Sequence, residues 1–176
     1  MVLLVVLAIA DNGRVSLDDV TEVARLLAPS TDWQPTAETI GACVERAIAR
    51  GLLRPVESSC PDNRMTLETT SAGRMVIVDL LRRPIARSSG GYMRACMSIK
   101  LCFLHYLPST ERSAQSDQLA QLYREAIEPL RWLQHLLRPP AGVALHDLRY
   151  EMVCMESELA WLDGMRRWPP QRLAAE

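Results

Sequence analysis

The sequence contains almost no lysine, few aromatic residues and no long hydrophobic run. Lys100 is the only lysine among 20 basic residues, so arginine carries nearly all of the positive charge. Aromatic residues make up 5% of the chain and Phe103 is the single phenylalanine. The core must therefore come from Leu, Val, Ile, Met and Ala, a composition that favours helices. A formal net charge of −1 excludes a strongly basic nucleic-acid coat protein.

The most apolar stretch, residues 1–10 (MVLLVVLAIA), is much shorter than the roughly 20 residues that a membrane span needs. No basic residue precedes it, so it is also a poor signal peptide, and we expect a buried first helix. The five cysteines are odd in number and form no C-x-x-C motif, which argues against a disulfide framework or a zinc ribbon. These features predict a cytoplasmic protein. The sequence leaves open a redox switch at a cysteine thiol, mainly at Cys60, which we expect in an exposed turn.

Chemistry-bearing motifs are also missing. The three histidines share no ligand spacing, and the sequence has no Gly-rich phosphate loop and no nucleophile elbow. We therefore expect no metal, no cofactor and no catalytic residue, and hence a protein that is not an enzyme.

The first 83 residues predict the order helix, helix, helix, hairpin, helix. The second helix should begin after Ser16, an N-cap followed by two acidic residues, and end before Pro29. Gly51 should end the third helix, and alternation from Met65 to Thr69 indicates a half-buried strand. The other expected elements are helices over 2–10, 36–50 and 71–81 and a strand over 52–57. This order is that of a winged helix-turn-helix; a generic small α+β domain is the alternative.

After a junction at 84–91, the remainder should be helical. Helices are expected over 93–107, 111–138 and 143–168, with Pro129 kinking or splitting the second of them. The last helix carries a heptad seam, which favours pairing with a second copy of the chain over packing within one chain. The seam consists of Leu145, Leu148, Met152, Met155, Leu159 and Leu162.

Several segments resemble the PadR-like family of bacterial transcriptional regulators. They are the apolar start, residues 44–53 (VERAIARGLL), 70–74 (TSAGR), 98–104 (SIKLCFL) and 156–162 (ESELAWL). The resemblance implies a mainly α protein with a small β-hairpin wing. It implies a winged helix-turn-helix DNA-binding domain over residues 1–86 and a helical dimerisation domain over 92–170. It also implies a homodimeric repressor, in some members released by a small-molecule effector. The sequence leaves open whether this chain binds such an effector. The candidate binding site is a pocket between the two domains, lined by Met93, Met97, Phe103 and Trp161.

The third helix and the wing hold the candidate DNA-binding residues. Threonine, glutamine, glutamate and alanine near the helix start suit base edges and thymine methyls, and arginines at its end and on the wing suit phosphates or the minor groove. The candidates are Gln34, Thr36, Glu38, Thr39, Ala42, Arg46, Arg50, Arg54, Asn63 and Arg64. Two such helices related by a two-fold axis predict a pseudo-palindromic operator on double-stranded DNA.

A protein-interaction adaptor that keeps this fold without DNA binding is the alternative. Glycine at position 41, the acidic Glu38 and Glu45, and a net charge of −2 over residues 1–86 favour it. A continuous acidic surface over the third helix would support the adaptor.

Overall fold

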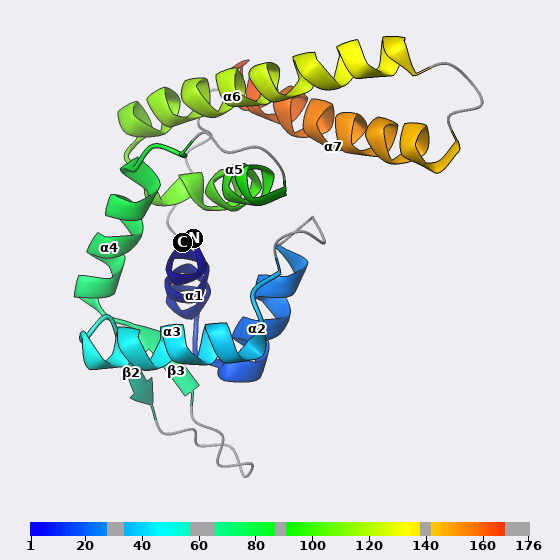
Figure 1. Cartoon of the computed structure of the whole chain (residues 1–176). Coiled ribbons are helices and arrows are strands. Elements are labelled where there is room, and N and C mark those ends of the chain that lie inside the picture. The colour runs from blue at the N-terminus through cyan, green and yellow to red at the C-terminus, as the bar shows by residue number, and fades with distance from the viewer. Residues whose placement is uncertain (28–33, 57–65, 87–90, 138–141, 168–176) are drawn as a thin grey trace. The chain divides into compact units, whose positions relative to one another are not determined.

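The computed structural model in Figure 1 describes residues 1–27, 34–56, 66–86, 91–137 and 142–167. The chain divides into two compact units, Met1–Pro108 and Ser109–Glu176. Residues 91–108 therefore group with the N-terminal unit, whereas the sequence interpretation placed residues 92–170 together as one functional domain.

The N-terminal unit is a winged helix-turn-helix followed by further helices. Its elements are α1 (Val2–Asp11), β1 (Val15–Ser16), α2 (Leu17–Leu26), α3 (Ala37–Ala49), β2 (Leu53–Val56), β3 (Thr66–Thr69), α4 (Ser71–Arg82), α5 (Gly91–Phe103) and the 3₁₀ helix η1 (Leu104–Tyr106). The fold expected from the sequence is thus confirmed. The fifth helix begins two residues earlier than expected, and its last turn narrows to the 3₁₀ helix η1.

The wing belongs to a three-stranded antiparallel sheet of order β1-β3-β2. The hairpin of β2 and β3 was expected, but β1 was not, because a strand of two residues leaves no alternation to recognise. Val15 pairs with Leu67 on one side of β3, and Arg54 pairs with Glu68 on the other. The sheet therefore ties the wing to the turn that enters α2.

Side-chain caps set the helix boundaries that the sequence predicts. Ser16 forms a full capping box with Asp19 at the start of α2, and Thr36 accepts from the backbone N–H of Thr39 at the start of α3. At the end of α3, Gly51 adopts φ +67°, the left-handed conformation that glycine favours. The N–H groups of Gly51 and Leu52 then bond to the carbonyls of Ile48 and Ala47, which completes a Schellman motif.

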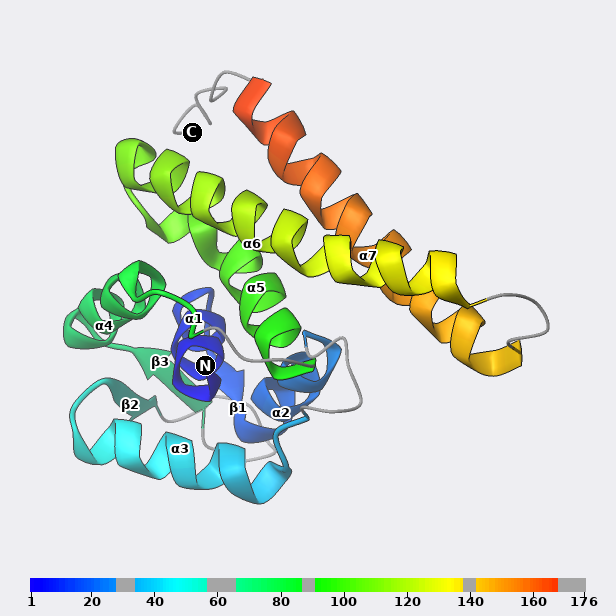
Figure 2. The same ribbon diagram turned by 45° about the horizontal axis from the view of Figure 1, so that its top comes forward.

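Helix α1 is the centre of the N-terminal core. Every residue from Leu4 to Ala10 is buried, and Figures 1 and 2 show α2, α3, α4 and β3 arranged around this helix. A helix that is apolar on all sides must be enclosed by its neighbours, which explains its uninterrupted hydrophobic sequence.

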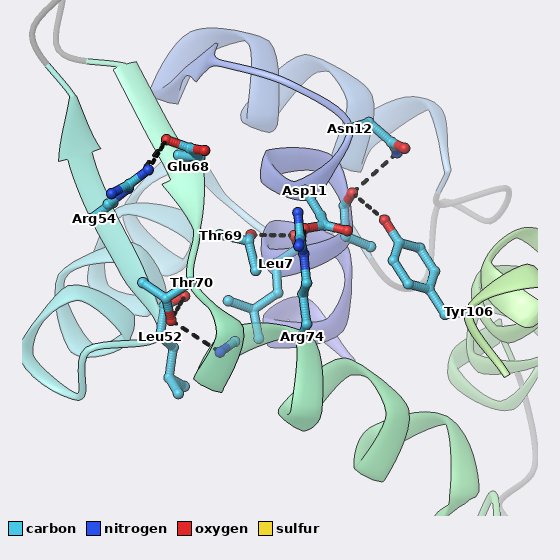
Figure 3. A network of polar contacts seen from close by, with 12 residues as sticks. Leu7, Asp11, Asn12, Leu52, Arg54, Glu68, Thr69, Thr70, Arg74 and Tyr106 are labelled. Atoms are coloured by element: carbon cyan, nitrogen blue, oxygen red, sulfur yellow. Dashed lines mark hydrogen bonds and ion pairs between the residues drawn. The ribbon is translucent and has the colours of Figure 1, made fainter. Parts of the chain in front are cut away.

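Hydrogen bonds and an ion pair connect α1 to the sheet and to later helices (Figure 3). Thr69 Oγ1 donates to the Leu7 carbonyl at 2.7 Å in the buried interior, and Tyr106 Oη donates to the Ala8 carbonyl at 3.2 Å. Arg74 Nε lies 2.6 Å from Asp11 Oδ1. Burial, followed by the nearby Asp11 carboxylate, raises the pKa of Tyr106 to about 12, so the phenol stays a hydrogen-bond donor at neutral pH.

Replacing Thr69 by valine keeps the shape of the side chain but removes its hydroxyl. We expect Thr69→Val to lower the free energy of unfolding by about 1 kcal/mol, because a buried hydrogen bond is lost without a new one. The matched control is Thr66→Val on the same strand, whose hydroxyl donates to the Val56 carbonyl at 2.9 Å in a less buried position. Urea titration followed by circular dichroism measures both, and an equal or larger loss for Thr66→Val would contradict the expectation.

The C-terminal unit consists of two long helices, α6 (Ser109–Leu136) and α7 (Gly142–Arg167), that pack along one another. Arg131 pairs with Glu156 at 2.7 Å and Arg124 with Asp163 at 3.3 Å, which joins the two helices at two levels. The sequence predicts a kink or a split at Pro129, and the helix is not split, because α6 continues through this residue. Pro129 is exposed, so water can satisfy the backbone carbonyl that lacks its helical partner.

The heptad seam of α7 is largely enclosed within the single chain. Leu148, Met152, Met155 and Leu162 are buried, and Leu145 and Leu159 are half-buried. Packing within one chain therefore accounts for the seam, and its role as a dimer interface stays a prediction. In the part of the chain that the structure describes, none of the helices has both the length and the apolar character that crossing a bilayer requires.

Candidate nucleic-acid interface

Helix α3 presents one apolar and one polar face. Ile40, Val44 and Ala47 are buried against the core, as the helical spacing predicts. The opposite face is exposed along the whole helix, and its residues are Glu38, Thr39, Ala42, Glu45, Arg46 and Ala49. An exposed polar helix face beside a β-hairpin is the arrangement that winged-helix proteins present to a duplex.

The start of α3 combines hydroxyl groups with the positive end of the helix dipole. Thr36 Oγ1 accepts from the Thr39 backbone N–H at 3.2 Å, and the two hydroxyls lie 2.9 Å apart. Gln34 precedes the helix and is exposed. The Thr36 hydroxyl therefore serves first as a cap, whereas the side chains of Thr39, Ala42 and Gln34 remain exposed on the surface.

The end of α3 carries the positive charge of this face. Arg46 Nε donates to the Ala42 carbonyl at 3.0 Å, one turn back along the helix. Arg50 is the C-cap residue and is exposed. Arg50 therefore lies at the negative end of the helix dipole, a position that stabilises cations, whereas the Arg46 side chain turns back toward the middle of the helix. Their placement on the last turns matches the role of phosphate contacts.

Arg54 lies at the base of the wing, on β2, in an ion pair. Its Nη2 and Nε donate to Glu68 Oε2 at 2.8 and 3.1 Å, across the strand pair (Figure 3). The sequence interpretation assigned Arg54 to DNA but missed Glu68, which follows from the register of the hairpin. The remaining wing candidates, Asn63 and Arg64, and the switch candidate Cys60 lie outside the described residues.

Eight of the ten candidates thus fall within the described residues. All eight are exposed in the N-terminal unit, along α3, at its two ends and on β2. Cys43, on the buried side of α3, is 8% exposed, and this burial raises the pKa of its thiol against the opposing effect of Arg46. Cys43 therefore belongs to the support of α3 rather than to its polar face.

The residues of the expected effector pocket lie in different environments. Met97 is fully buried in the core, and Trp161 belongs to the other unit. Phe103 lines a cavity of about 460 Å³ within the N-terminal unit, together with Ile9, Val23 and Leu27. A pocket built from the four residues expected from the sequence stays a prediction.

Comparison with known proteins gives structural likeness without sequence relatives. No protein-family model matches the chain, and no curated protein matches it either. Bacillus subtilis PadR in complex with operator DNA is similar at 15% identity, with 93% of this chain and 94% of that chain covered and a TM-score of 0.44.

Two further structures are similar to the same degree. The PadR-like transcriptional regulator BC1756 from Bacillus cereus is 14% identical, with 91% of this chain and 94% of that chain covered and a TM-score of 0.45. The Vibrio cholerae virulence activator AphA is 16% identical, with 93% and 95% covered and a TM-score of 0.43. At these identities and TM-scores, the likeness assigns no activity to this chain.

Proposed function

We propose that this protein is a DNA-binding transcriptional regulator that reads duplex DNA through α3 and the wing. The observation that carries the proposal is the exposed polar face of α3, with hydroxyl and amide groups at its start and arginines at its end, beside the β2–β3 hairpin. Arg46 and Arg50 bind phosphates, while Gln34, Thr39 and Ala42 face the base edges. Thr36 holds the start of the helix, and the wing lies over the adjacent groove.

The regulator acts as a homodimer, most simply as a repressor that covers a pseudo-palindromic operator. The C-terminal unit supplies the contact between copies. Beyond the buried seam of α7, this unit exposes large apolar side chains that pairing would remove from water, namely Trp132 and Leu136 on α6 and Tyr150 and Val153 on α7.

Neutralising both arginines of α3 tests the proposal directly. We expect Arg46→Gln/Arg50→Gln to weaken binding to a duplex from upstream of the protein's own gene by roughly 10-fold to 100-fold at 50 mM salt. The slope of log affinity against log salt should fall by about 2 per protomer, because two phosphate contacts are lost. Fluorescence anisotropy with a labelled duplex measures both quantities.

The matched control is Arg25→Gln, which removes an exposed arginine from α2, outside the proposed interface. It should leave the slope unchanged, apart from the small effect of net charge. Loss of binding to the same extent in the control, or no binding by the wild type at low salt in a verified dimer, would overturn the proposal.

An adaptor that has lost DNA binding is the second candidate. The exposed carboxylates of Glu38 and Glu45 on the α3 face favour it, because both would repel phosphates. The same titration separates the two functions, since an adaptor shows no salt-dependent affinity for any duplex.

A further inference from the structure

The charge of Arg54 is cancelled within the wing itself. Arg54 and Glu68 are direct partners in the register of β2 and β3, and two guanidinium nitrogens converge on a single carboxylate oxygen. The Arg54 side chain is 64% exposed and that of Glu68 is 35% exposed, so the pair lies at the surface and not in the core. The described base of the wing therefore offers a neutral pair where a DNA-binding wing would present a cation.

A second ion pair lies close to the first. Arg74, whose guanidinium also feels the charge of Glu68, is held by Asp11 at 2.6 Å (Figure 3). Glu68 is also anchored by its position, because Leu67 and Thr69 on either side of it point into the buried interior. Glu68 thus stays on the outward face of β3, opposite Arg54, whose side chain is the longer and the more exposed of the two.

An exposed ion pair of this kind is weak, because water solvates both partners. A phosphate is a better partner for a guanidinium, since its binding also releases condensed counterions from the duplex. An approaching duplex can therefore draw Arg54 away from Glu68, but the carboxylate left behind repels the same phosphate.

On this basis we propose that Glu68 is a residue that limits affinity. It competes with DNA for Arg54 and keeps the wing from contributing a full phosphate contact. The inference rests on the proposed DNA-binding function and deepens it, because it names the residue that sets how tightly, and with what salt dependence, the wing engages any duplex.

The test is a double-mutant cycle with Glu68→Gln and Arg54→Gln. Binding to a labelled 20-bp duplex of arbitrary sequence is measured by anisotropy over a salt series, because phosphate contacts do not require an operator. We expect Glu68→Gln to raise the affinity roughly threefold to tenfold and to steepen the salt slope by up to about 0.9 per protomer. In the Arg54→Gln background, the same substitution should raise the affinity much less, because no guanidinium remains to be released.

Glu22→Gln is the matched control, since it removes an exposed carboxylate from α2. An equal gain in that control, or an equal gain from Glu68→Gln with and without Arg54, would show general charge repulsion and overturn the inference. Tighter binding by Glu68→Gln than by the wild type, with little or no gain in the Arg54→Gln background, would support it. Binding by neither protein would overturn both the inference and the proposed function, whereas wild-type binding that Glu68→Gln leaves unchanged would overturn the inference only.

Discussion

Gly73→Ala should destabilise the N-terminal unit by about 3 kcal/mol, the upper range for overpacking a close contact. A Cβ atom at this position would lie 2.3 Å from the Leu52 carbonyl oxygen and 2.7 Å from Thr69 Cγ2. The first of these is a backbone atom in the turn that closes α3, and it cannot move aside. The Leu52 carbonyl is held in place because it accepts from both the backbone N–H and the hydroxyl of Thr70.

The same substitution at Gly41 should have the opposite sign. A Cβ at that position of α3 meets nothing within 4 Å, and alanine is the better helix former. We expect Gly41→Ala to raise the free energy of unfolding by about 0.5–1 kcal/mol. Urea denaturation of both variants beside the wild type gives the comparison. Shifts of the same sign would show that the close approach of α4 to Leu52 is not as described.

The stability of the protein should rise with pH above pH 8, because of Lys100. This side chain is 3% exposed, and its Nζ donates to the Leu81 carbonyl at 2.8 Å and to the Arg83 carbonyl, at the end of α4. Burial lowers its pKa to about 8 from 10.5, against a smaller opposing effect of Cys96. Between these two values the unfolded chain binds more protons than the folded one, so the free energy of unfolding increases with pH.

The full effect of Lys100 amounts to about 3 kcal/mol, of which about 2 kcal/mol should develop between pH 7 and pH 9.5. Lys100→Met removes this titration, so the informative quantity is the difference in pH dependence between wild type and variant. The difference also cancels the opposite contribution of the Cys43 thiol, whose pKa burial raises. Remaining below pH 9.5 avoids the tyrosines. Parallel pH profiles for the two proteins would show that the amine is not desolvated.

Local signals in the sequence are sufficient to predict most of the helices and strands of the N-terminal unit. The cap at Ser16 and the glycine at 51 act within one turn of helix, so their residue types alone mark the boundaries. The polar face of α3 likewise follows from helical spacing. These are short-range effects that do not require knowledge of the tertiary structure.

Contacts that depend on distant segments were not foreseen. The hydrogen bond from Thr69 to Leu7 joins residues 62 positions apart. The pairing of Arg54 with Glu68 depends on a strand register that the connecting segment alone does not fix. The apolar composition of residues 93–107 predicts a largely buried helix that includes Lys100, but nothing in the sequence indicates that the end of α4 supplies its carbonyl partners.

Because Lys100 is the only lysine, a lysine-specific protease can cut this chain at a single bond, between residues 100 and 101. That bond lies within α5, with Ile99, Lys100 and Leu101 all buried. The rate of cleavage by such a protease therefore measures how often α5 opens locally. Cleavage gives two fragments that are separated on a gel, so no label has to be introduced.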